Sequence, residues 1–270
     1  MKKISVMKRG KKQWNKTIFV LPSLFTIGSM YCAFSSIASS VEGKLSSAAV
    51  FIGLSIVLDG LDGRIARLIN AHSEMGLQLD SLSDMIAFGI APSLLIYYWA
   101  FHPYYGGYYS KAGFMAAFLF VTCCAIRLAK FNIQSILFDK RFFSGLPSPA
   151  AAGVIASLVY YYPVPLKASS ASLIAISLLV ILSYLMVSKI KYYSFKTINF
   201  RNQKSYLYIV MLALILALII TFAQIALISL STLYLLSGIF MKIIELRKKE
   251  KTANTNIALE KGGAEGSTPP

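Results

Sequence analysis

Residues 59–84 read DGLDGRIARLINAHSEMGLQLDSLSD, and this stretch joins two apolar segments. It holds four of the five aspartates of the chain, namely Asp59, Asp62, Asp80 and Asp84. Burying an unpaired carboxylate beside hydrocarbon is costly, so four of them together require a compensating cation. The stretch therefore predicts a metal site at a membrane surface.

The sequence on either side of this stretch is strongly apolar. Of the 270 residues, 56% are hydrophobic and only 14% are charged, which suits a bundle of spanning helices better than one soluble core. Backbone groups in hydrocarbon must find partners within their own segment, so each apolar run is expected to be a helix. The sequence predicts an all-α polytopic membrane helix bundle with about eight transmembrane helices. The apolar runs fall at roughly 17–37, 45–66, 77–100, 112–130, 147–163, 172–188, 206–221 and 225–241. The last two runs lack a polar linker, and one long tilted helix is the alternative there.

The basic residues indicate how the bundle is oriented. The formal net charge is +16, and 24 of the 27 lysines and arginines fall in the N-terminal arm, in alternate loops and in the C-terminal segment. Under the positive-inside rule, both termini and the aspartate stretch face the cytoplasm. Charges placed between apolar runs are typical of loops that touch anionic lipid headgroups, so nucleic acid is not an expected partner.

The spacing of the aspartates predicts how they meet. Asp59 and Asp62 are three residues apart, and Asp80 and Asp84 are four apart, so each pair shares one face of a helix. Antiparallel packing of the two helices brings the pairs together. Two divalent cations would cancel the repulsion and hold a diphosphate, and oxygen ligands favour Mg²⁺ or Mn²⁺.

Three neighbouring residues agree with a phosphate-containing substrate. Gly63 and Ala66 are small and leave room beside the carboxylates, where a nucleotide can approach the backbone. Arg67 carries a forked cation that matches phosphate oxygens. Together these residues predict a metal-assisted phosphoryl-type transfer. The alternative for interfacial Asp and Arg residues is a set of ion-paired helix ends.

The same positions resemble the signature of the CDP-alcohol phosphatidyltransferases, and every signature residue is present. The pattern is Asp59-x-x-Asp62-Gly63-x-x-Ala66-Arg67, then eight residues, then Gly76-x-x-x-Asp80-x-x-x-Asp84. The resemblance implies that the four aspartates bind two divalent metal ions and that Asp84 is also the general base. It further implies that Gly63, Ala66 and Arg67 contact the CDP moiety and that the protein is a homodimer.

Three further stretches resemble the bacterial phosphatidylserine synthases of the integral-membrane type, so that the resemblance covers roughly residues 17–190. They are LPSLFTIGSMYCAF from Leu21, AIRLAKFNIQ from Ala125 and FSGLPSPAAAG from Phe143. The first departs from the usual pattern, because Ser23 and Ser29 stand where asparagine is usual.

These stretches add candidate ligands. The resemblance assigns Ser23 or Thr26 to nucleotide contacts. It assigns Arg127, Lys130 and Asn132 to the carboxylate of serine or to a lipid phosphate. Lys130 stands where arginine is usual, which keeps the charge and loses the forked geometry.

The resemblance implies transfer of the phosphatidyl group from CDP-diacylglycerol to L-serine, among membrane lipids, in a bacterial inner membrane with the site facing the cytoplasm. Residues 17–190 would form the six-helix catalytic core, after a basic cytoplasmic arm over 1–16. Residues 191–249 would form two further transmembrane helices, and 250–270 a disordered tail. One alternative keeps the chemistry with glycerol 3-phosphate, inositol phosphate or choline as acceptor. Another is a cation transporter, in which intramembrane carboxylates line an ion path.

Overall fold

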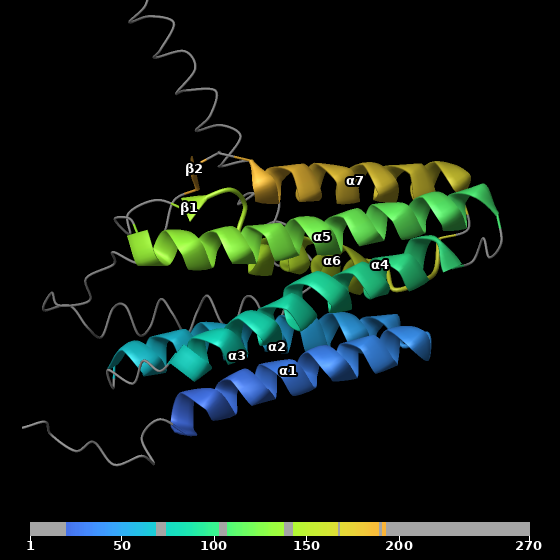
Figure 1. Ribbon diagram of the computed structural model, residues 1–270. Helices are drawn as coiled ribbons and strands as arrows, with labels where there is room; N and C mark the ends of the chain where they lie inside the picture. The colour runs from blue at the N-terminus through green and yellow to red at the C-terminus, as the bar shows by residue number, and fades with distance from the viewer. Residues whose placement is uncertain are drawn as a thin grey trace, which may run out of the picture.

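The structure is a computed structural model that describes residues 20–68, 74–102, 107–137, 143–166, 168–188 and 191–192. These residues form a helical bundle with one short strand pair (Figure 1). The helices are α1 (Val20–Val41), α2 (Leu45–Leu68), α3 (Glu74–Asp84), α4 (Ala91–Ala100), α5 (Tyr108–Leu137), α6 (Ser148–Tyr161) and α7 (Ser169–Val187). The strands β1 (Phe143–Ser144) and β2 (Lys191–Tyr192) pair antiparallel.

The prediction of a helical bundle is confirmed within these ranges, apart from the two-residue strands β1 and β2. Five helical segments of the described chain are long and apolar enough to cross a membrane. The helix α6 has only 14 residues, and at 1.5 Å per residue it is short for a span of about 30 Å. The two apolar runs predicted at 206–221 and 225–241 lie outside the described residues, as do the arm over 1–16 and the tail over 250–270.

The outer surface of the bundle suits a lipid environment. Large apolar side chains such as Leu24, Tyr31 and Phe34 on α1 are exposed. The side chains on the opposite face of α1, which packs against α2, include small polar residues. The hydroxyls of Ser29 and Ser55 lie 2.7 Å apart between the two helices. Small residues let helix backbones approach closely, and such hydroxyls bond across the interface.

The helix α3, a π-helical turn (Met85–Ile90) and α4 follow one another without a break (Figure 1). This segment contacts α1 and α2 as well as α5 and α6, and α2 also packs directly on α6. The sequence predicted one regular helix over 77–100. Pro92 explains the difference, because it has no N–H to donate to the preceding turn and its ring crowds the carbonyl four residues back. The wider turn ends at Ala91, whose N–H donates to the carbonyl of Ile86 five residues earlier.

The path of the chain collects the functional segments at one end of the bundle. The ends of α2, α5 and α7 lie there together with the starts of α1, α3 and α6, and the β1–β2 pair lies beside them (Figure 1). The opposite end is closed by aromatic packing, in which the rings of Tyr97 and Phe114 meet edge to face with centroids 6.3 Å apart. The indole N–H of Trp99 donates to the carbonyl of Tyr162 at 2.8 Å. The two ends of the bundle therefore differ in chemistry.

Candidate active site

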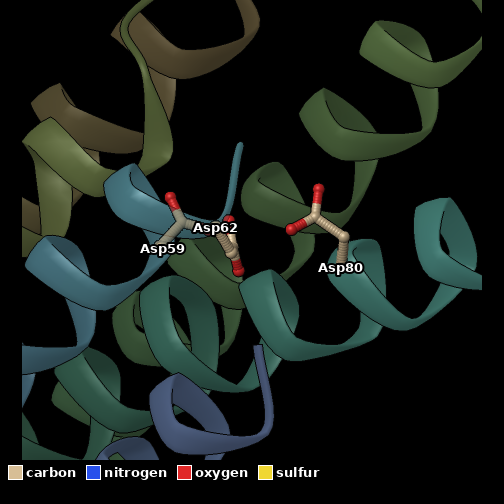
Figure 2. A group of neighbouring side chains, drawn as sticks. All are labelled: Asp59, Asp62 and Asp80. Atoms are coloured by element: carbon tan, nitrogen blue, oxygen red, sulfur yellow. The ribbon is translucent and has the colours of Figure 1, made fainter. Parts of the chain in front are cut away.

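Three aspartates meet between α2 and α3. Asp59 and Asp62 lie near the end of α2 and turn toward α3, and Asp80 on α3 turns back toward them (Figure 2). One carboxylate oxygen from each residue lies within 4.8 Å of the other two. The faces expected from the three- and four-residue spacings are therefore brought together. Asp62 is only 4% exposed, so its charge has little water to offset the repulsion, and a divalent cation among these oxygens would do so.

Asp84 joins this group from the last position of α3, just before the π-helical turn. Its carboxyl group makes a hydrogen bond with that of Asp59. Its Oδ1 atom is buried and has no hydrogen-bond partner among the described residues. Two carboxylates in contact need either a shared proton or a cation between them, and a buried oxygen without a donor is available to a metal. The residues present thus fit a divalent ion.

Thr26 on α1 orients one of these candidate ligands. Its Oγ1 donates to Asp62 Oδ2 at 2.9 Å, and both side chains are buried. The backbone carbonyl of Thr26 accepts from Ser83 Oγ at 3.2 Å, which ties α1 to α3. The resemblance assigned Thr26 to the nucleotide, and sequence reasoning missed the contact with Asp62, which joins residues 36 positions apart. Ser23 lies half-buried one turn earlier on α1.

The residues expected to face CDP occupy the last turns of α2. Gly63 is exposed, and a Cβ added there would meet no atom within 4 Å. Open space beside Asp62 agrees with the expectation that a bulky group approaches here. The backbones of Ala66 and Arg67 continue α2 to its end at Leu68, and their side chains lie outside the described residues.

The basic and amide residues of α5 contact the neighbouring helices. Arg127 donates from Nη1 to Ser148 Oγ at 2.6 Å, and its charge acts on Asp84. Asn132 donates from Nδ2 to Ser81 Oγ at 2.9 Å, beside Asp80. Lys130 is half-buried on the same helix. Sequence reasoning had not singled out Ser81 or Ser148, although each lies beside a residue or within a motif that it had quoted.

The comparisons with known proteins agree with this arrangement. The sequence model of the family described as CDP-alcohol phosphatidyltransferase matches residues 19–187, more than half of the chain and nearly all of the described bundle. The chain belongs to the CDP-alcohol phosphatidyltransferase family. Members of this family are generally dependent on divalent metals, and the group of Asp59, Asp62 and Asp80 is able to hold such an ion.

Relatives within the family carry a narrower name. A protein of Helicobacter pylori (strain ATCC 700392 / 26695) named CDP-diacylglycerol--serine O-phosphatidyltransferase is 37% identical over 203 residues, which cover 73% of this chain and 82% of the relative. A protein of the same name from Bacillus subtilis (strain 168) is 36% identical over 188 residues, with 68% and 96% covered. A third from Methanocaldococcus jannaschii is 31% identical over 202 residues, with 75% and 88% covered.

Proposed function

We propose that this protein transfers the phosphatidyl group of CDP-diacylglycerol to the hydroxyl of L-serine, giving phosphatidylserine and CMP. The observation that carries the proposal is the meeting of Asp59, Asp62 and Asp80 within 4.8 Å at one end of the bundle, in a chain whose relatives are named for this reaction. These carboxylates would hold divalent cations, which would supply positive charge for binding a diphosphate.

The aspartates divide the work of the reaction. Asp59, Asp62, Asp80 and Asp84 would hold two divalent ions, Mg²⁺ or Mn²⁺, and bound ions would supply charge neutralisation for the diphosphate and the CMP leaving group. Asp84 also accepts the proton of the serine hydroxyl as the new oxygen–phosphorus bond forms. The bond from that phosphorus to the bridging oxygen of CMP breaks, and CMP leaves with the electron pair.

The remaining candidate residues bind the substrates. Gly63, Ala66 and Arg67 at the end of α2 contact the CDP moiety, with room beside Gly63 for its approach. Ser23 on α1 contributes to the same nucleotide site. Thr26 holds Asp62 in place.

The acceptor and the lipid phosphate lie on the side of α5. Arg127, Lys130 and Asn132 offer a guanidinium, an ammonium and an amide there, the donors that a carboxylate or a phosphate requires. The charge of Arg127 acts on Asp84, which supports the proposal of an anion site beside the base.

The charge distribution supports a topology for the whole chain. Residues 17–190 form the catalytic core, preceded by a basic arm over 1–16 and followed by two further transmembrane helices over 191–249 and a disordered tail over 250–270. This makes eight helices with both termini in the cytoplasm of a bacterial cell, since 24 of 27 basic residues fall on one side. The active site then faces the cytoplasm at the inner membrane, where serine and CMP exchange with solvent while the lipid enters from the side. The protein acts as a homodimer.

A direct assay tests the function. Membranes containing the full chain are incubated with CDP-diacylglycerol and radiolabelled serine, and in parallel with labelled glycerol 3-phosphate, inositol phosphate or choline. We expect label in lipid with serine alone, and loss of it in Asp59→Asn but not in Glu42→Gln, an exposed carboxylate paired with Lys44 at the other end of the bundle. Lipid labelled from one of the other alcohols, and not from serine, would show that this alcohol is the acceptor. No transfer to any of them, with metal-ion flux through reconstituted vesicles, would favour a transporter.

A further inference from the structure

A chain of buried and half-buried polar side chains runs from α6 through α5 to the acidic group. Ser148, the first residue of α6, is 0% exposed. Its Oγ accepts from Arg127 Nη1 at 2.6 Å, and the charge of Arg127 acts on Asp84. The Ser148 hydroxyl also lies within hydrogen-bond reach of the Cys124 thiol, one turn before Arg127 on α5. The proposed function gives Ser148 no role in metal binding, substrate binding or proton transfer.

The backbone around Ser148 is fixed by α7. Gly145 has φ of +90°, which L side chains rarely adopt, and a Cβ added to it would run into the carbonyl oxygen of Met186. The next residue, Leu146, is fully buried and donates its N–H to the carbonyl of Leu185 at 2.9 Å. The start of α6 is therefore held against the end of α7, and Ser148 is held with it.

The hydrogen bond from Arg127 to Ser148 fixes the position of a half-buried cation. An arginine side chain has several rotatable bonds, and a short hydrogen bond at one end of the guanidinium removes much of that freedom. Arg127 is the cation that acts on Asp84, within a group of four carboxylates. A shift of the guanidinium would change the field at Asp84.

We infer that Ser148 is a positioning residue for the reaction: it holds the guanidinium of Arg127 at the place from which that charge acts on Asp84. Ser148 touches neither substrate. The inference rests on the proposed transferase function, because its consequence is a change in turnover.

The test compares Ser148→Ala with Ser157→Ala in the full chain. Ser157 is also buried on α6, and its hydroxyl donates to the carbonyl of Val154 in the same helix. Loss of a hydrogen bond to a charged group predicts that Ser148→Ala lowers kcat by about tenfold to a hundredfold. The KM values for both substrates should change by a smaller factor than kcat, since the guanidinium of Arg127 is kept and only its position is released. Ser157→Ala should retain wild-type kcat, and both variants should melt at similar temperatures in detergent.

A double-mutant cycle with Arg127→Lys separates positioning from a general effect on folding. The lysine keeps the charge and loses the guanidinium fork, so Ser148→Ala should cost much less in that background. An equal loss of kcat in both backgrounds, or wild-type kcat in Ser148→Ala, would overturn the inference while leaving the transferase function in place. A raised KM for serine with an unchanged kcat would also overturn it, because Ser148 would then affect binding of the acceptor and not turnover. If the wild-type protein made no phosphatidylserine, the proposed function itself would fail.

Discussion

Replacing Thr26 by valine removes one hydroxyl from the acidic group and leaves the shape of the side chain nearly unchanged. In the wild type, Thr26 Oγ1 donates to Asp62 Oδ2 at 2.9 Å. Thr26 is 6% exposed and Asp62 is 4% exposed, so water has little access to replace the lost donor. The bond from Ser83 to the Thr26 carbonyl is made to the backbone and stays. The substitution therefore removes a hydrogen bond that orients the Asp62 carboxylate, one of the candidate metal ligands.

The expected size follows from the charge of the acceptor. A hydrogen bond to a charged group contributes about 1.5–3 kcal/mol, more than a neutral one. At about 1.4 kcal/mol per factor of ten, this corresponds to about tenfold to a hundredfold in an equilibrium constant. Partners that orient metal ligands have effects of about the same size on metal affinity. We expect the Mg²⁺ concentration for half-maximal activity to rise by that factor, with kcat at saturating Mg²⁺ within about threefold of wild type.

The assay is formation of phosphatidylserine by purified protein in detergent, titrated with Mg²⁺ and then with Mn²⁺. Thr26→Ser keeps the hydroxyl and should titrate like the wild type. Ser36→Ala serves as a second control, because Ser36 is a buried hydroxyl of the same helix that donates to the carbonyl of Ala48, away from the acidic group. An unchanged metal titration in Thr26→Val, with a raised KM for CDP-diacylglycerol, would refute this reasoning and return Thr26 to the nucleotide.

Three further predictions follow from the same geometry. Asp84→Asn should lower turnover by about a hundredfold or more while the protein still inserts into membranes, because the proposed base is lost; near-wild-type formation of phosphatidylserine would contradict this role. Treatment with EDTA should abolish activity, and added Mg²⁺ or Mn²⁺ should restore it; activity that persists in excess chelator would remove the metal from the reaction. Gly145→Ala should lower the melting temperature by about 3 °C or more, because its φ of +90° and the carbonyl of Met186 leave no place for a methyl group. Gly53→Ala is the matched control, since a Cβ at that helical position meets no atom within 4 Å.

The acidic group was predictable because its pattern is local. Residues three or four apart share a helix face, so the pairs formed by Asp59 with Asp62 and by Asp80 with Asp84 required only that two apolar runs be helices. The short connection between those runs then favours antiparallel neighbours. The structure does bring carboxylates of α2 and α3 together. The binding of metal by these residues stays a prediction.

The contacts that orient the acidic side chains were not predictable in this way. Asp62 accepts from a residue 36 positions away, and Arg127 donates to one 21 positions away. Hydrophobic periodicity gives the faces of helices, but it does not say which serine or threonine of one helix meets which polar group of another. The π-helical turn after Asp84 was missed for a related reason. One extra residue in a single turn changes the hydrophobic pattern too little to be told from the 3.6-residue period of an α-helix.

The two ends of the bundle show why the hydroxyls gather where they do. At the end away from the aspartates, rings and backbone groups close the fold, with Trp99 bonded to the Tyr162 carbonyl. At the other end, Thr26 on α1 donates to Asp62 on α2, and Asn132 on α5 donates to Ser81 on α3. Ser148 on α6 accepts from Arg127 on α5.

Such contacts would be a poor way to stabilise a membrane bundle, since each contributes little compared with tight packing of small residues. They are well suited to holding like charges at fixed positions, because a carboxylate or guanidinium with a fixed partner cannot swing away from its neighbours. A site that grips a diphosphate needs its ligands in place before the substrate arrives, since ordering them afterwards would reduce the binding free energy left for catalysis. The polar contacts therefore serve reactivity, and the apolar core between the two ends serves the fold.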